Sequence, residues 1–114
     1  MEYIWSSEID SILSVGRSLE SVGVRNWALD RESALTALEQ LSAMEVAVLG
    51  GDVYEVSNTN AESNYDNWYC NRDSGEAEAV FVERSITKAR NYIANYQAKA
   101  GSVLFAIVPS VVPK

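Results

Sequence analysis

The chain has 114 residues, of which 47% are hydrophobic and 22% charged, with a formal net charge of -7 and no histidine. This composition predicts one folded domain, residues 1–114, and the acidic balance argues against nucleic acid or an anionic membrane as a partner. Without histidine the chain has no Ser-His or Cys-His catalytic pair, and with a single cysteine, Cys70, it has no ordinary structural zinc site.

The first residues predict neither a signal peptide nor a membrane span. Residues 1–15 lack a basic region followed by a long apolar run. No run in the chain approaches the roughly 18 apolar residues of a spanning helix. The lone cysteine excludes an internal disulfide, which is typical of the cytoplasm. We therefore expect a cytoplasmic protein without cofactors.

The first half of the chain predicts two helices separated by a loop. We expect a short helix that Ser6 or Ser7 caps and Gly16 ends. Residues 19–24 predict a turn, and residues 27–29 an apolar plug. Asp30 is a good N-cap for a second helix that reaches about residue 44. Its leucines and alanines form one buried stripe: Ala34, Leu35, Ala37, Leu38 and Leu41.

The middle of the chain predicts a β-hairpin. Two layouts fit the Gly-Gly step at residues 50–51: a tight turn between two short strands, or a bulge within one long strand over residues 46–56. We prefer the long strand, because the Asn- and Ser-rich residues 57–63 already form a turn that leads into a strand at residues 65–70.

The last third predicts a loop at residues 71–75 and a long helix from residue 74 or 76 to about 98. Its core seam is Val82, Ile86, Ala89, Ile93 and Tyr96. Side chains off this seam are expected in solvent: Glu83, Arg84, Lys88 and Arg90. Residues 103–108 predict a strand buried on both faces. The fold class is therefore α+β, with a small, mostly antiparallel sheet packed against the long C-terminal helix and the Leu-rich helix.

Charge singles out the segment between Arg31 and Arg72. It holds seven acids and no lysine or arginine, whereas the rest of the chain holds nine acids and nine bases. An acidic, aromatic hairpin predicts a docking surface for a basic protein. The candidate partner-binding residues are Asp52, Tyr54, Glu55, Glu62, Tyr65, Asp66 and Trp68.

Other roles for these residues stay open. Asp52, Glu55 and Asp66 could converge on a hard cation or act as a carboxylate pair in a small enzyme. Alternatively, Asp52 and Asp66 bond to backbone amides or to the indole of Trp27 or Trp68. The β-rich middle could also provide an edge for self-association.

Two further features are interpreted as structural. Ser85 and Lys88 match the S-x-x-K spacing of serine acyl-enzymes, but the companion motifs are absent and Lys88 would point away from the core. Cys70, which follows two aromatic residues on a predicted strand, is interpreted as a buried small hydrophobe.

Several blocks of the sequence resemble a known family. They are Trp-Ala-Leu at 27–29, Gly-Gly-Asp-Val-Tyr at 50–54 and Asp-Asn-Trp-Tyr-Cys at 66–70, followed by Arg-Ser at 84–85 and Tyr-Ile at 92–93. In this order they resemble the immunity protein 40 family of bacterial polymorphic toxin systems, over residues 9–108. The resemblance implies a small α+β protein, encoded beside a toxin, that protects the producing cell by binding the toxin. It assigns no contact residues.

Together, the charge pattern and the resemblance predict a non-enzymatic immunity protein. It would bind a cognate toxin domain stoichiometrically. Because many toxins that attack nucleic acids have basic clefts, an acidic inhibitor could occupy such a cleft and exclude the substrate. The alternative is a small carboxylate-based metal-binding protein or enzyme.

Overall fold

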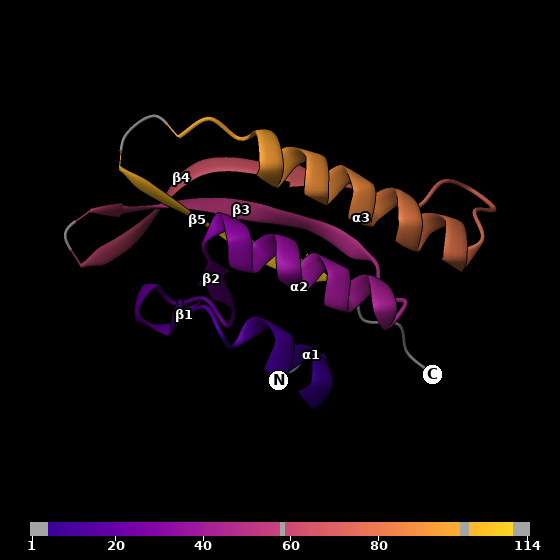
Figure 1. Ribbon diagram of the computed structural model, residues 1–114, viewed down its shortest axis with the longest axis horizontal. Coiled ribbons are helices and arrows are strands. Elements are labelled where there is room, and N and C mark those ends of the chain that lie inside the picture. Colours follow the sequence, from indigo (N-terminus) through magenta and orange to yellow (C-terminus); the bar gives the residue numbers. More distant parts are fainter. Residues whose placement is uncertain (1–4, 58, 99–100, 111–114) are drawn as a thin grey trace.

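The computed structural model describes residues 5–57, 59–98 and 101–110. A five-stranded antiparallel sheet carries two long helices across one of its faces, which confirms the predicted α+β class (Figure 1). Along the chain the elements are α1 (Ser7–Leu13), β1 (Arg17–Ser18), the 3-10 turn η1 (Glu20–Val22), β2 (Trp27–Leu29), α2 (Arg31–Ala43), β3 (Val48–Ser57), β4 (Asn60–Tyr69), α3 (Glu78–Asn95) and β5 (Ser102–Pro109).

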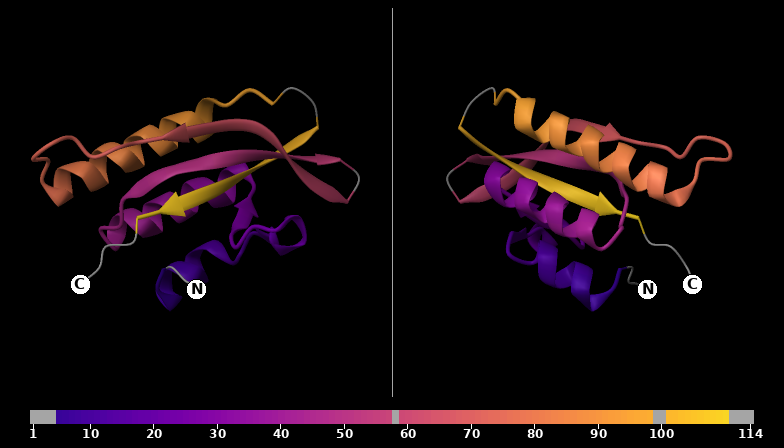
Figure 2. Two further views of the ribbon diagram at one scale, coloured as in Figure 1. Left: turned by 180° about the vertical axis from the view of Figure 1, so that it is seen from behind. Right: turned by 45° about the vertical axis from the view of Figure 1, so that its right-hand side comes forward.

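The strand order is β1-β2-β5-β3-β4, so the C-terminal strand lies inside the sheet and β4 forms one edge. Figure 2 (left) shows the sheet from the side that α2 and α3 leave uncovered. Phe105 and Ile107 of β5 belong to the core under the helices, while Ala106 belongs to a smaller apolar cluster with Leu19. Burial on both faces explains why this strand is almost wholly apolar.

The predicted helix starts are confirmed for α1 and α2. The Ser6 hydroxyl accepts a hydrogen bond from the Ile9 amide, and the Asp30 carboxylate accepts one from the Ser33 amide at 2.8 Å. Residues 27–29 are a strand rather than a plug, because Ala28 pairs with Ala106 of β5. Nothing in the three residues themselves shows that a partner strand arrives from the far end of the chain.

The core seam of α3 is confirmed from Val82 to Ile93, and Phe81 extends it. The helix starts at Glu78, later than predicted. Glu76 belongs to the preceding loop, where its side chain accepts a hydrogen bond from the Asp73 amide. The helix ends at Asn95, since Tyr96 is already extended.

The preferred layout of one long strand across the Gly-Gly step is also confirmed. The register with β5 shifts between Val48 and Gly50, and pairing with β4 continues through Gly51. A Cβ at Gly51 would lie 2.2 Å from Cη2 of Trp68, so only glycine lets the indole pack against this strand.

The hairpin turn is shorter than the predicted residues 57–63. Ser57 pairs with Asn60 and Val56 with Ala61, so β4 already begins at Asn60. Asparagine and serine in this segment favour turns, but pairing with β3 outweighs that local preference. Residue 58, within the predicted turn, lies outside the described residues.

Candidate partner-binding surface

The register of the hairpin divides the predicted partner-binding residues between the two faces of the sheet. Asp52 pairs with Asn67, and the adjacent pair, Gly51 with Trp68, therefore faces the opposite side. Trp68 lies in the core beneath the helices. Asp52 and Tyr54, which are two residues apart on β3, thus lie on the uncovered side of the sheet. Glu55 and its pair Glu62 lie on the side that the helices cover.

Two of the predicted contact residues are buried. Tyr54 is 6% exposed and packs in the small cluster with Leu19 and Ala61. Trp68 is 5% exposed, and its ring centroid lies 4.8 Å from that of Tyr92. Neither ring can reach a partner in this structure, because each is packed in an apolar cluster.

Tyr65, in contrast, is 85% exposed at the edge of the sheet. Its φ of 70° is unusual for a residue with a side chain and marks an irregularity in β4. Asp52 pairs with Asn67, and Tyr54 pairs with Ser63. Between these two pairs, β3 has one residue and β4 has three, so β4 bulges. We refer to residues 63–67 as the Tyr65 bulge.

Side chains hold the backbone of this bulge in place. The Tyr65 amide donates to Oγ of Ser63 at 3.1 Å, and the Asp66 amide donates to Oδ1 of Asn64 at 3.0 Å. Nδ2 of Asn67 donates to the Tyr65 carbonyl at 3.1 Å. The bulge therefore holds Tyr65 on a preorganised backbone, which would lower the entropic cost of any contact that this side chain makes.

Glu55 and Glu62 face each other across β3 and β4. Nδ2 of Asn64 donates to Oε2 of Glu55 at 3.1 Å, but within the described part of the chain no cation forms an ion pair with either glutamate. Like charges directly opposite each other destabilise a hairpin. These two glutamates, together with Tyr65 and Asp66, are here called the acidic hairpin surface.

A hydrogen-bonded chain connects this surface to the end of α3. The Tyr96 hydroxyl donates to Oδ2 of Asp66 at 2.6 Å and accepts a bond from Nδ2 of Asn64 at 2.8 Å. Burial, and then the bond to Asp66, raise the pKa of Tyr96. Nε1 of Trp68 has no hydrogen-bond partner among the described residues, so it donates neither to Asp52 nor to Asp66.

Asp52 is separate from the acidic hairpin surface. It lies exposed on the uncovered face, paired with Asn67 on one side and Ala106 on the other. Partial burial of the carboxyl group raises its pKa. No hydrogen bond to the Asp52 carboxylate occurs among the described residues, so the alternative in which Asp52 bonds to backbone amides or to an indole has no support there.

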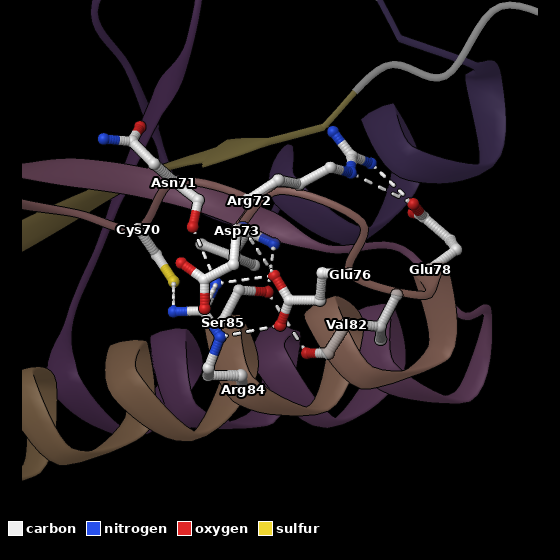
Figure 3. A network of polar contacts seen from close by, with 10 residues as sticks. Cys70, Asn71, Arg72, Asp73, Glu76, Glu78, Val82, Arg84 and Ser85 are labelled. Atoms are coloured by element: carbon white, nitrogen blue, oxygen red, sulfur yellow. Dashed lines mark hydrogen bonds and ion pairs between the residues drawn. The ribbon is translucent and has the colours of Figure 1, made fainter.

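A polar network that the sequence did not predict lies at the start of α3 (Figure 3). Arg84, expected in solvent, donates to both carboxylate oxygens of Glu76, to the Asn71 carbonyl and, at 3.4 Å, to Sγ of Cys70. The bond from Arg84 is the main reason that the pKa of Glu76 falls to about 2. The network fixes the loop before α3, and the helical seam alone could not predict it.

Ser85 and Cys70 are structural, as interpreted from the sequence. Ser85 is buried; its hydroxyl accepts a bond from the Val48 amide at 3.0 Å and donates to the Val82 carbonyl. Lys88 instead lies exposed, 5.3 Å from the centroid of the Tyr69 ring. Cys70 is buried with a free thiol.

The structure gives the metal-site alternative no geometric support. Over residues 5–57, 59–98 and 101–110, no three Cys, Asp or Glu side chains gather closely enough to hold a metal ion. In the same residues, no helix is both long and apolar enough to cross a membrane.

Comparison with known families decides the identity. The sequence model of the family described as immunity protein 40 matches residues 18–109, from β1 to the last residue of β5. The chain belongs to this family. Every sequence block that carried the resemblance lies within the matched range, so the predicted family is confirmed. The chain is therefore an immunity protein, and its family implies a cognate toxin as the partner. No curated protein and no solved structure matches the chain.

Proposed function

We propose that this immunity protein neutralises its toxin by stoichiometric, non-catalytic binding, and that the acidic hairpin surface contacts a basic region of the toxin. The observation that carries the proposal is the opposition of Glu55 and Glu62 without a compensating cation in the described residues, beside the exposed Tyr65. A lysine or arginine of the toxin would relieve the repulsion between the two carboxylates.

The same charges would act before contact. An acidic surface accelerates encounter with a basic one, and the acceleration weakens as salt shortens the screening length to about 10 Å at 0.1 M. A nuclease toxin, with a basic cleft for its substrate, fits this surface well. Occupation of such a cleft would exclude the substrate without any chemistry by the immunity protein.

Association kinetics with the toxin encoded beside the gene test the proposal. We expect Glu55→Lys, Glu62→Lys and the double variant to slow association and weaken binding, while thermal melting shows an intact fold. The single variants place a lysine opposite a glutamate, so they should stabilise the hairpin slightly.

Glu39→Lys is the matched control for the two single variants, because Glu39 is exposed on α2 and the variant changes the net charge as much as each of them. Equal association rates for the hairpin variants and the wild type would overturn the acidic hairpin surface as the interface. Equal slowing by Glu39→Lys would show an effect of overall charge only.

A further inference from the structure

A groove lies between the C-terminal end of α2 and the N-terminal half of α3, with a volume of about 710 Å³. The residues that line it include Met44, Glu45, Val82, Glu83, Ile86 and Arg90. In Figure 1 this end of α3 and the turn between β3 and β4 lie at opposite ends of the molecule. The groove is therefore separate from the acidic hairpin surface.

The floor of the groove is apolar. Val82 and Ile86 lie one turn apart on α3 and are buried in the core, while Met44, just beyond α2, is 41% exposed. Methionine is flexible and polarisable, and it adapts to different apolar partners. The groove thus offers a place for an apolar side chain of a partner.

The rim of the groove is mainly acidic. Glu45, Glu78 and Glu83 line it with a single base, Arg90. Glu78 forms an ion pair with Arg72 at 2.7 Å, but neither Glu45 nor Glu83 forms an ion pair with any of the described residues. The charge that complements this rim is positive.

Glu45 lies at a position where the end of α2 disfavours an acidic residue. Its φ is 60°, its amide donates to the Ser42 carbonyl, and the Val46 amide donates to the Leu41 carbonyl. This is a Schellman motif, in which the left-handed residue is usually glycine. The negative end of the helix dipole also disfavours a carboxylate there. Glu45 on the rim therefore lowers the stability of the fold relative to glycine at this position.

We infer that the groove binds a basic, amphipathic segment of a partner protein. One of its apolar side chains would enter over Met44, Val82 and Ile86, and its lysine or arginine side chains would pair with Glu45 and Glu83. The inference is independent of the proposed function. The groove lies away from the acidic hairpin surface, so it can bind a partner segment whichever surface contacts the toxin.

A synthetic amphipathic helical peptide of leucine and lysine tests the inference, with its leucine–glutamate counterpart as the negative probe. We expect the lysine peptide to shift the amide NMR signals of the floor residues Met44, Val82 and Ile86. Its dissociation constant should rise at least about tenfold in the Glu45→Lys/Glu83→Lys double variant, because both rim carboxylates that would pair with the peptide are then replaced by like charges.

The matched control is the Glu32→Lys/Glu39→Lys double variant, which makes the same charge change on exposed positions of α2 outside the groove. It should bind the lysine peptide within about threefold of the wild type, since only distant, screened charges change. Equal loss of affinity in both double variants would overturn the inference, as would shifts confined to the hairpin or the absence of binding.

Glu45→Gly separates the two properties of this position. It should raise the melting temperature, because glycine adopts the left-handed conformation without strain, and it should weaken binding of the lysine peptide. A variant that is more stable and binds equally well would show that the acid has no part in binding. None of these measurements uses the toxin, so their failure would leave the proposed function standing.

Discussion

The hydroxyl of Tyr96, just beyond the end of α3, donates a hydrogen bond of 2.6 Å to the carboxylate of Asp66 on the edge strand β4. The ring of Tyr96 also packs edge-on against Phe105, with 5.7 Å between centroids. One side chain thus links the long helix, the middle of the sheet and the acidic hairpin surface. We expect this link to set the rigidity of the hairpin.

Tyr96→Phe should lower the free energy of unfolding by about 1–2 kcal/mol, because the ring packing stays while the bonds to Asp66 and Asn64 are lost. Denaturant unfolding measures the loss, and hydrogen exchange should quicken in the Tyr65 bulge. Tyr69→Phe serves as the control, since Tyr69 is exposed. Equal stability of the two variants would show that the Tyr96 hydroxyl contributes nothing.

Ile93 is the most C-terminal buried residue of the α3 seam. Ile93→Ala should cost about 2–5 kcal/mol in the free energy of unfolding, through lost burial and the cavity left behind. Chemical denaturation provides the measurement. A loss below about 0.5 kcal/mol would mean that this face of the helix is not packed as described.

Gly51→Ala should destabilise the fold through a clash rather than through backbone strain. The new Cβ would lie 2.2 Å from the indole of Trp68 and 2.5 Å from the Ala106 carbonyl oxygen. We expect a loss of about 1–3 kcal/mol or more. Gly75→Ala, where no described atom lies within 4 Å but φ is +75°, should cost only about 1 kcal/mol. The reverse order would contradict the close packing of Trp68.

Acid should loosen the loop before α3. The pKa of Glu76 is about 2, below its ordinary value of 4.5, so the network with Arg84 stabilises the fold fully above pH 4.5. That contribution is lost as pH falls from 4.5 toward 2, because protonation removes the charge that Arg84 binds. NMR titration of the Asp73 and Glu76 amides measures the change. In Glu76→Gln this step should disappear, and its persistence there would assign it to another group.

Tyr65→Ala should weaken toxin binding without affecting the fold. Because the side chain is 85% exposed, the free energy of unfolding should change by less than about 0.5 kcal/mol. If Tyr65 anchors the contact, binding should lose about 2 kcal/mol, mainly through faster dissociation. Surface plasmon resonance with the toxin measures both rates, and an unchanged dissociation rate would remove Tyr65 from the interface.

Much of the fold could be predicted from local patterns. The Asp30 cap, the seam from Val82 to Ile93 and the apolar strand at the C-terminus each depend on spacing within one element. The short strand β2 could not be predicted, since it exists through pairing with a distant part of the chain, as in Ala28 with Ala106.

The candidate site was harder to predict for a different reason. Alternation along a strand shows which side chains share a face, but not what covers that face. The core under the helices buries Trp68, and the small cluster with Leu19 buries Tyr54 on the other face, so both rings resembled contact residues. The Tyr65 bulge then interrupts the alternation within β4. Arg84 was misplaced because its partner, Glu76, lies in the loop rather than on the helix.

The hydrogen bonds inside the Tyr65 bulge have a consequence at high protein concentration. An open strand edge can recruit the same strand of another molecule and seed aggregation. In β4 the side chains of Ser63, Asn64 and Asn67 already occupy backbone groups of Tyr65 and Asp66, which a recruited strand would need. Pairing between two copies would therefore have to start at one end of β4, where only a few residues could register.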